Sequence, residues 1–194
     1  MQLEYTVAVT ADEFRRRTAR AAESGQWFET VFNEHWTRVY SVLFRMVGDR
    51  GEAEDLALET FWRLYTRPPR SADNLGGWLY RVAANLGLNA LRARQRRAGY
   101  ELQAGQETLV LDQAPDPAKE TERAEQRQLV QTVLARLKPR SAQVLTLRHS
   151  GLSYVEIAAA LRLNVSSIGT LLARAEVEFE KVYREIGGEF DAPQ

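Results

Sequence analysis

Residues 153–172 read SYVEIAAALRLNVSSIGTLL, and this stretch decides the fold of the second half of the chain. Its apolar spacing predicts a short amphipathic helix over 153–161, a turn at 162–164 and a second helix from Val165. This pattern is typical of the DNA-binding helix-turn-helix, in which the second helix enters the major groove. A plain pair of packed helices in a bundle is the alternative interpretation.

The same kinds of signal mark helix starts and stops in the rest of the chain. A short polar residue followed three positions later by glutamate caps a helix start, and glycine closes a helix end. Gly25 is expected to separate the first two helices, and Pro139 the last two before residue 153. We expect an all-α fold with helices over 10–24, 26–47, 49–65, 75–97 (capped by Asp73 or Asn74), 117–137 and 140–149.

Composition divides these helices between two small domains. Residues 98–127 carry seven acidic and three basic side chains, and glycine and proline interrupt their helical period. We therefore expect a flexible acidic linker between an N-terminal helical bundle and a C-terminal helix-turn-helix domain. The expected boundaries are 1–25 for an N-terminal extension, 26–97 for the first domain, 98–125 for the linker, 126–186 for the second domain and 187–194 for a tail.

Composition also argues against several classes of protein. The chain has no cysteine and two histidines, so we expect no disulfide, no metal site and no cofactor. It shows neither a Gly-rich phosphate loop nor a nucleophile–base pair, so we expect no catalytic residue and no enzyme. No apolar run approaches the ~18 residues of a membrane span, and the first residues do not resemble a signal peptide. We therefore expect a cytoplasmic protein without membrane insertion.

Acidic and basic side chains cancel overall, 26 against 26, but not locally. Residues 52–59 contain four acids and no base, whereas 74–97 contain five arginines and no acid. Two asparagines one turn apart and two aromatic side chains accompany these arginines. Aromatic rings stack on unpaired bases, asparagine reads base edges and arginine neutralises phosphate. The alternative is a buried aromatic pair with solvated charged helix faces.

Four strings that occur in order carry a family resemblance: EAEDLALETFWRLY at 52–65, GGWLYRVAANLGLNALR at 76–92, LTLRHSGLSYVEIAAAL at 145–161 and GTLLARAE at 169–176. With them the chain resembles the extracytoplasmic-function (ECF) sigma factors, the small two-domain class of bacterial transcription initiation factors. The resemblance covers about residues 27–97 and 126–185. It implies a protein that binds core RNA polymerase, directs it to specific promoters and helps melt the promoter DNA.

The resemblance also implies partners and contact residues for the first domain. The acidic helix would dock on a coiled coil of the largest polymerase subunit, and an anti-sigma factor would hold the two domains inactive. For Leu56 and Phe61 a place in the core is an equally good interpretation. The docking residues would be Asp55, Leu56, Glu59 and Phe61.

Promoter DNA would be bound by both domains. The loop at 66–77 and the helix after it would capture the melted strand, although a purely structural role is the stronger interpretation for Trp78. The single-strand residues would be Trp78, Tyr80, Arg81, Asn85, Asn89, Arg92, Arg94, Arg96 and Arg97. The duplex-binding residues of the second domain would be Arg148, Ser153, Tyr154, Ser166, Ser167, Thr170 and Arg174.

Two departures from the family pattern concern the helix-turn-helix. Arg162 stands where the family usually has glycine, and a positive φ at a non-glycine residue costs ~1 kcal/mol or more. The second helix carries Gly169, Thr170 and Leu171 in place of a basic and polar reading surface. We therefore expect this helix to recognise DNA through its shape and backbone.

Two other functions stay open at this point. An autonomous helix-turn-helix regulator would bind a specific duplex as a dimer, without polymerase. A helical protein-interaction module would bind another regulator and would not open a promoter.

Overall fold

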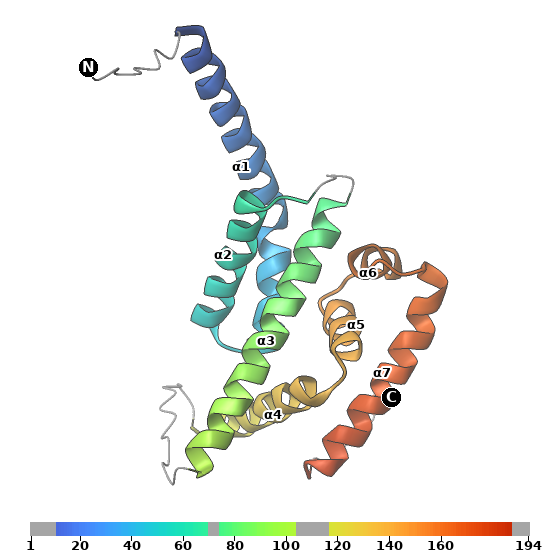
Figure 1. The fold of residues 1–194 in the computed structure, drawn as a ribbon. Helices are drawn as coiled ribbons and strands as arrows, with labels where there is room; N and C mark the ends of the chain where they lie inside the picture. Colours follow the sequence, from blue (N-terminus) through green and yellow to red (C-terminus); the bar gives the residue numbers. More distant parts are fainter. Residues whose placement is uncertain (1–10, 70–73, 104–116, 188–194) are drawn as a thin grey trace, which may run out of the picture. The chain divides into compact units, whose positions relative to one another are not determined.

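The computed structural model in Figure 1 describes the backbone of residues 11–69, 74–103 and 117–187, and the side chains of 25–69, 74–100 and 124–187. In these ranges the regular elements are seven α-helices, which confirms the all-α prediction. The predicted capping pair Thr10–Glu13, the cap Asp73, the centre of the linker and the tail lie outside the described side chains.

The described residues fall into two units, of which the first ends at Trp36 and the second begins at Thr37. The first unit holds the N-terminal part of α1 (Ala11–Val47), on which three aromatic rings follow one another at four-residue spacing. Phe32 lies between Phe28 and Trp36, with ring centroids 6.2 and 4.9 Å away. Gly25 lies within α1, so the predicted break there is wrong. A single exposed glycine costs a helix only about 1 kcal/mol, which the helix-forming residues on both sides offset.

In the second unit, the end of α1, α2 (Arg50–Thr66) and α3 (Leu75–Gln103) form what we call the N-terminal lobe, residues 37–103. Gly48 ends α1 as predicted, because its φ of +71° suits glycine and its N–H donates to Phe44 O at 2.8 Å. Asp49 then caps α2 by accepting the N–H of Glu52 at 2.7 Å. The largest fully buried side chains of this lobe are Leu43, Met46, Phe61, Leu64 and Leu79.

The third helix begins as predicted and ends later than predicted. The side chain of Asn74 accepts the N–H of Gly77 at 3.0 Å, which confirms the predicted cap. The helix continues to Gln103, so residues 98–103 are helical and do not belong to the linker. Gly87 sits where α3 approaches α1, since an added Cβ would lie 2.6 Å from the sulfur of Met46.

The C-terminal lobe, residues 117–187, contains α4 (Pro117–Arg136), α5 (Pro139–His149), α6 (Tyr154–Leu161) and α7 (Val165–Glu185). Since α4 starts at Pro117, residues 117–125 are helical too, and this end of the predicted linker is corrected. Glu178 of α7 caps α5 by accepting the N–H of Lys138 at 3.0 Å. The largest fully buried side chains are Leu137, Leu147, Leu152, Ile157 and Ile168.

The helix α3 packs against helices of both lobes. It packs against α2 on one side and against α4, α5 and α6 of the C-terminal lobe on the other (Figure 1). In the C-terminal lobe, α7 packs against α4, α5 and α6. Most of the residues predicted to meet melted DNA therefore lie on the helix that also carries the contact between the lobes.

Within the described ranges, no single helix is long and apolar enough to cross a membrane. Only α6 and α7 taken together pass that test of length and composition, and they are bent by 92° from one another.

Candidate nucleic-acid interface

The two asparagines of α3 lie one turn apart, and both are exposed, as the predicted single-strand surface requires. Asn89 faces solvent without a hydrogen bond to the C-terminal lobe among the described contacts. The side-chain oxygen of Asn85, in contrast, accepts a hydrogen bond from the amide of Gln143 in α5. The side chain of Gln143 is buried. In this conformation the side-chain oxygen of Asn85, which would contact a base, is therefore bound to the C-terminal lobe.

Two of the five α3 arginines hold helix ends together. Arg92 donates to Ala135 O at 3.2 Å and to Leu137 O at 2.9 Å, so it binds two carbonyl groups at the end of α4. Arg94 pairs with Glu52 of α2 and donates to Gln131 of α4 at 3.1 Å. Both arginines therefore bind protein groups in this conformation, and their role on the DNA backbone stays a prediction.

The other α3 arginines differ from these two. Arg96 and Arg97 are exposed and stay available for phosphate. Arg81 is half-buried and donates to Ala160 O of α6 at 3.5 Å. Burial lowers the pKa of Arg81, and the neighbouring charges of Arg162 and Arg140 lower it further.

The two aromatic side chains at the start of α3 differ in exposure. Tyr80 is 4% exposed, so its predicted contact with unpaired bases is wrong in this conformation. A side-chain hydrogen bond with Tyr80 raises the pKa of Arg38, and Glu156 of α6 raises it further. Trp78 is half-buried, which fits either a structural role or a contact with DNA. The loop before α3 is described only outside residues 70–73.

The predicted polymerase surface on α2 is exposed in part. Asp55 is exposed, Leu56 is half-buried, and Glu59 accepts a hydrogen bond from Arg63 at 2.8 Å. Phe61 is 1% exposed and belongs to the core, so its assignment to the docking surface is wrong. It sits one helical turn from two other buried side chains, Ala57 and Leu64, on the inner face of α2.

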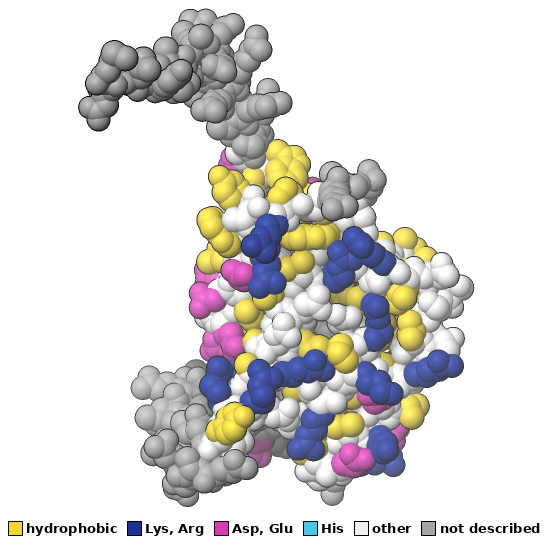
Figure 2. Space-filling view, in the orientation of Figure 1, with side chains coloured by type: hydrophobic (Ala, Val, Ile, Leu, Met, Phe, Trp, Pro, Cys, Tyr) yellow, Lys and Arg dark blue, Asp and Glu magenta, His cyan; other side chains and the backbone are white. Residues whose placement is uncertain are grey.

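An exposed apolar stripe that was not predicted from the sequence lies beside these acids. Leu58, Trp62 and Tyr65 are 49%, 60% and 61% exposed, and the rings of Trp62 and Tyr65 stack at 5.8 Å. Figure 2 shows hydrophobic side chains above acidic ones along the edge of the molecule that α2 forms in Figure 1. Their spacing of four and three residues places them on one face of a helix. The sequence pattern alone does not show whether such an apolar face is buried in the core or exposed on the surface.

The helix-turn-helix has the predicted geometry. Ser153 and Glu156 form a reciprocal capping box at the start of α6, and α7 leaves the turn at 92° to α6. Arg162 has φ 55°, the left-handed conformation expected at the turn. The second helix starts at Val165 as predicted, with Asn164 at its N-cap, and the side chain of Asn164 makes no capping hydrogen bond.

The predicted duplex-binding residues lie around the start of α7 and the end of α5. Ser166, Thr170 and Arg174 are exposed on α7, whereas the hydroxyl of Ser167 donates to Asn164 O at 2.7 Å. At the other site, the guanidinium of Arg148 lies 5.4 Å from the ring centroid of Tyr154. This cation–π contact brings together two residues that the resemblance had assigned separately to DNA. Gly169 and Leu171, on the same helix, are half-buried.

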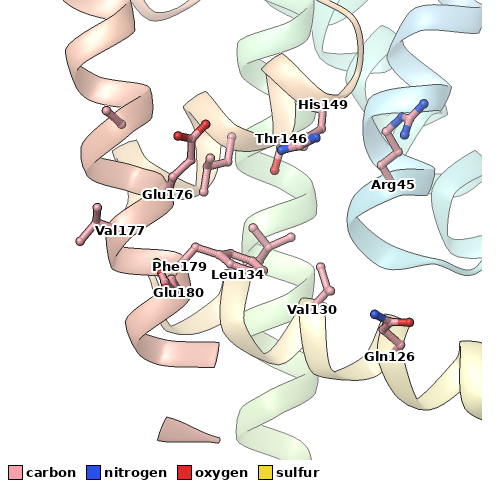
Figure 3. A pocket seen from close by; sticks show the side chains of 12 residues that line it. Arg45, Gln126, Val130, Leu134, Thr146, His149, Glu176, Val177, Phe179 and Glu180 are labelled. Atoms are coloured by element: carbon pink, nitrogen blue, oxygen red, sulfur yellow. The ribbon is translucent and has the colours of Figure 1, made fainter. Parts of the chain in front are cut away.

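A cavity of about 970 Å³ lies between α4, α5 and α7 (Figure 3). Leu134, Val130 and Phe179 form its apolar wall, and Arg45, His149 and Glu176 lie among its polar groups. The buried hydroxyl of Thr146 at this cavity has no hydrogen-bond partner. The described side chains contain no cluster of three or more His, Asp or Glu residues that would hold a metal ion.

Two regions of the chain match models of known protein families. Residues 31–97 match the family model of Sigma-70 region 2, and residues 127–178 match that of Sigma-70, region 4. The first match contains α2 and most of α3, and the second contains the helix-turn-helix.

Individual relatives agree with this result. The ECF RNA polymerase sigma factor SigE of Mycolicibacterium smegmatis is 33% identical over 165 residues, which cover 81% of this chain and 61% of that protein. The ECF RNA polymerase sigma factor SigW of Bacillus subtilis is 27% identical over 170 residues, which cover 82% of this chain and 90% of that protein. A solved structure of the sigma factor RpoE with the anti-sigma factor NepR, from Bartonella quintana, aligns at 19% identity and a TM-score of 0.46, over 81% of this chain and 96% of that one.

Proposed function

Since this chain belongs to the ECF sigma factors, we propose that it binds core RNA polymerase, directs it to specific promoters and helps melt the promoter DNA. One observation carries the proposal. A helix with exposed asparagines and arginines lies in the same chain as a helix-turn-helix, and the two regions match Sigma-70 regions 2 and 4 in that order. An autonomous regulator would need only the second region. We propose a role without catalysis, at the polymerase in the bacterial cytoplasm.

We propose the outer face of α2 as the polymerase contact. Glu54 and Asp55 are exposed at its start, and the stripe of Leu58, Trp62 and Tyr65 follows towards its end. A basic partner helix with apolar side chains matches both parts of this face, since charges steer the encounter and apolar anchors supply affinity. The coiled coil of the largest polymerase subunit is the partner that the family resemblance implies.

We propose that α3 holds the melted strand through Asn85, Asn89, Arg96 and Arg97. Unstacking a base costs a few kcal/mol, and each base-edge or stacking contact returns about 1–3 kcal/mol. Two captured bases therefore sustain melting without nucleotide hydrolysis. The side-chain oxygen of Asn85 can contact a base only after its hydrogen bond with Gln143 breaks, so promoter opening requires that this contact between α3 and α5 be released.

The C-terminal lobe supplies the duplex contact in this proposal. Ser166, Thr170 and Arg174 are exposed on α7, and Arg148 and Tyr154 lie together beside it. An anti-sigma factor, which the family resemblance implies, would keep the promoter-binding faces covered. To test this, the protein is purified from its native host. An inhibitor protein should copurify with it, and this inhibitor should no longer copurify once transcription from the target promoters has begun.

The experiment is transcription in vitro with core polymerase and the DNA upstream of the gene for this protein. The double variant Asp55→Lys and Glu59→Lys should lose polymerase binding, and Glu125→Lys, an exposed acid on α4, should keep it. Asn85→Ala with Asn89→Ala should keep polymerase binding and lose promoter opening, measured by permanganate reactivity. Normal transcription by both double variants would refute the site assignments, and failure of the wild type to form a holoenzyme would refute the function.

A further inference from the structure

Three arginines from three segments of the chain meet at the C-terminal end of α6. Arg81 of α3 donates to Ala160 O at 3.5 Å, and Arg140 of α5 donates to the next carbonyl, Leu161 O, at 3.2 Å. Arg162 follows Leu161 directly and forms the C-cap of the helix. The guanidinium groups of both lobes are therefore collected at one helix end.

The charge of this arginine cluster exceeds what the helix end neutralises. The C-terminus of a helix carries roughly half a negative charge, against three positive guanidinium groups. Among the described groups that shift the pKa of Arg81, burial comes first and the charges of Arg162 and Arg140 follow, with no carboxylate among them. Figure 2 shows Lys and Arg side chains spread over this face, including the region where α3, α5 and α6 meet in Figure 1.

The backbone of Arg162 adds an independent observation. Its φ of 55° is the only positive value at a non-glycine residue in the described ranges, and this conformation is strained for a residue that carries a Cβ. Glycine would satisfy the turn equally well without strain. Since strain that the fold does not need points to function, what arginine adds at this position is its exposed guanidinium.

The next helix contributes to the same positive region. Asn164, two residues after Arg162, leaves the N-terminus of α7 without a side-chain cap. Free N–H groups and the positive end of the helix dipole favour an anion there. This helix end only supports the case, which stands on the three side chains.

We propose that Arg81, Arg140 and Arg162 form a phosphate-binding site that bridges the two lobes and takes a compact polyanion of the diphosphate or triphosphate class. Guanidinium groups bind phosphate oxygens bidentately, and three of them match the charge of such a group. The bound anion removes the repulsion among the arginines and so stabilises the contact between α3 and the C-terminal lobe. Its source is a free nucleotide or the backbone of a nucleic acid, which share this chemistry.

The test uses the full chain without polymerase, so its outcome is independent of the proposed function. Sodium tripolyphosphate is titrated into the protein by calorimetry, and thermal unfolding is followed with and without it. Wild type should bind and unfold at a higher temperature with the probe. Arg162→Gly relieves the strain and so folds, and Arg140→Gln removes a second charge; each should weaken binding about tenfold or more. Arg136→Gln, an exposed arginine at the end of α4, removes the same charge elsewhere and should bind as wild type does.

Further arms identify the source of the phosphate. ATP and a short DNA duplex are titrated against the same variants, with sodium sulfate at equal ionic strength as the control. Loss of ATP binding in Arg162→Gly assigns the site to a free nucleotide, and loss of duplex binding assigns it to a nucleic-acid backbone. The proposal is overturned if wild type does not bind tripolyphosphate, if sulfate produces the same stabilisation, or if Arg136→Gln loses as much affinity as Arg162→Gly.

Discussion

Arg38 in α1 donates to the carboxylate of Glu156 in α6 at 2.6 Å, although the two residues are 118 positions apart. The same carboxylate accepts the N–H of Ser153 at 2.8 Å and completes the capping box of α6. The side chain of Glu156 thus caps the first helix of the helix-turn-helix and also binds this helix to the N-terminal lobe. The hydrogen bond from the Ser153 backbone is the largest of the contributions that lower the pKa of Glu156, and Arg38 adds to it.

Substitution of Glu156 separates its two roles. Glutamine still accepts the Ser153 N–H, so Glu156→Gln loses only the exposed ion pair and should cost a few tenths of a kcal/mol. Glu156→Ala loses the cap as well and should cost about 1 kcal/mol more. The measurement is urea denaturation at neutral pH. Equal losses in the two variants would show that the cap adds nothing.

Because the pKa of Glu156 is lowered, we expect the stability of the protein to depend on pH. The pKa of Glu156 in the folded protein lies below its ordinary value of 4.5, so its stabilising contribution is complete above that pH. It declines as the pH falls through the lowered pKa, because protonation removes the charge. The difference in melting temperature between wild type and Glu156→Gln should therefore shrink in acid. A difference that stays constant between neutral pH and pH ~3 would contradict this assignment.

The parts of the fold that the sequence predicts are those with local causes. The capping box of Ser153, the glycine stop at Gly48 and the break at Pro139 each depend on residues a few positions apart. The contacts of Arg92 and Arg94 join residues 37 to 47 positions apart and leave no periodic signal. The sequence around an arginine on a helix face does not indicate whether its side chain binds phosphate or the end of another helix. The structure is needed to show that Arg94 binds protein groups whereas Arg96 is exposed.

The arginines of α3 should divide into two groups by experiment. Arg94 joins Glu52, Gln131 and the carbonyl of Val47, so Arg94→Gln leaves a half-buried carboxylate without its partner. We expect a loss of about 1–3 kcal/mol in the free energy of unfolding. Arg96→Gln and Arg97→Gln remove exposed charges and should change stability by less than ~0.5 kcal/mol while weakening binding to single-stranded promoter DNA in the holoenzyme. Equal destabilisation by all three substitutions would refute the division.

Two glycines of α3 offer a matched test of its packing. A Cβ on Gly87 would meet the buried side chain of Met46 at 2.6 Å, whereas a Cβ on Gly99 meets nothing within 4 Å. Gly87→Ala should therefore lower the free energy of unfolding by about 1–3 kcal/mol. Gly99→Ala should raise helix stability by up to about 1 kcal/mol, because alanine is the better helix former. Chemical denaturation measures both, and a neutral Gly87→Ala would show that α1 and α3 do not pack this closely.

Trp62 provides the last test, and it concerns the proposed polymerase contact. Its ring is 60% exposed, stacks on Tyr65 and follows the exposed acids of α2. Large aromatic side chains at the centre of an interface carry a disproportionate share of its affinity, so Trp62→Ala should weaken holoenzyme formation about tenfold or more. Its melting temperature should stay near that of wild type, because the ring lies outside the core. Tyr100→Ala, at a ring 69% exposed on α3, is the control. Unchanged affinity in Trp62→Ala, measured by fluorescence anisotropy with core polymerase, would remove the aromatic stripe from the docking surface and leave the acidic residues to account for it.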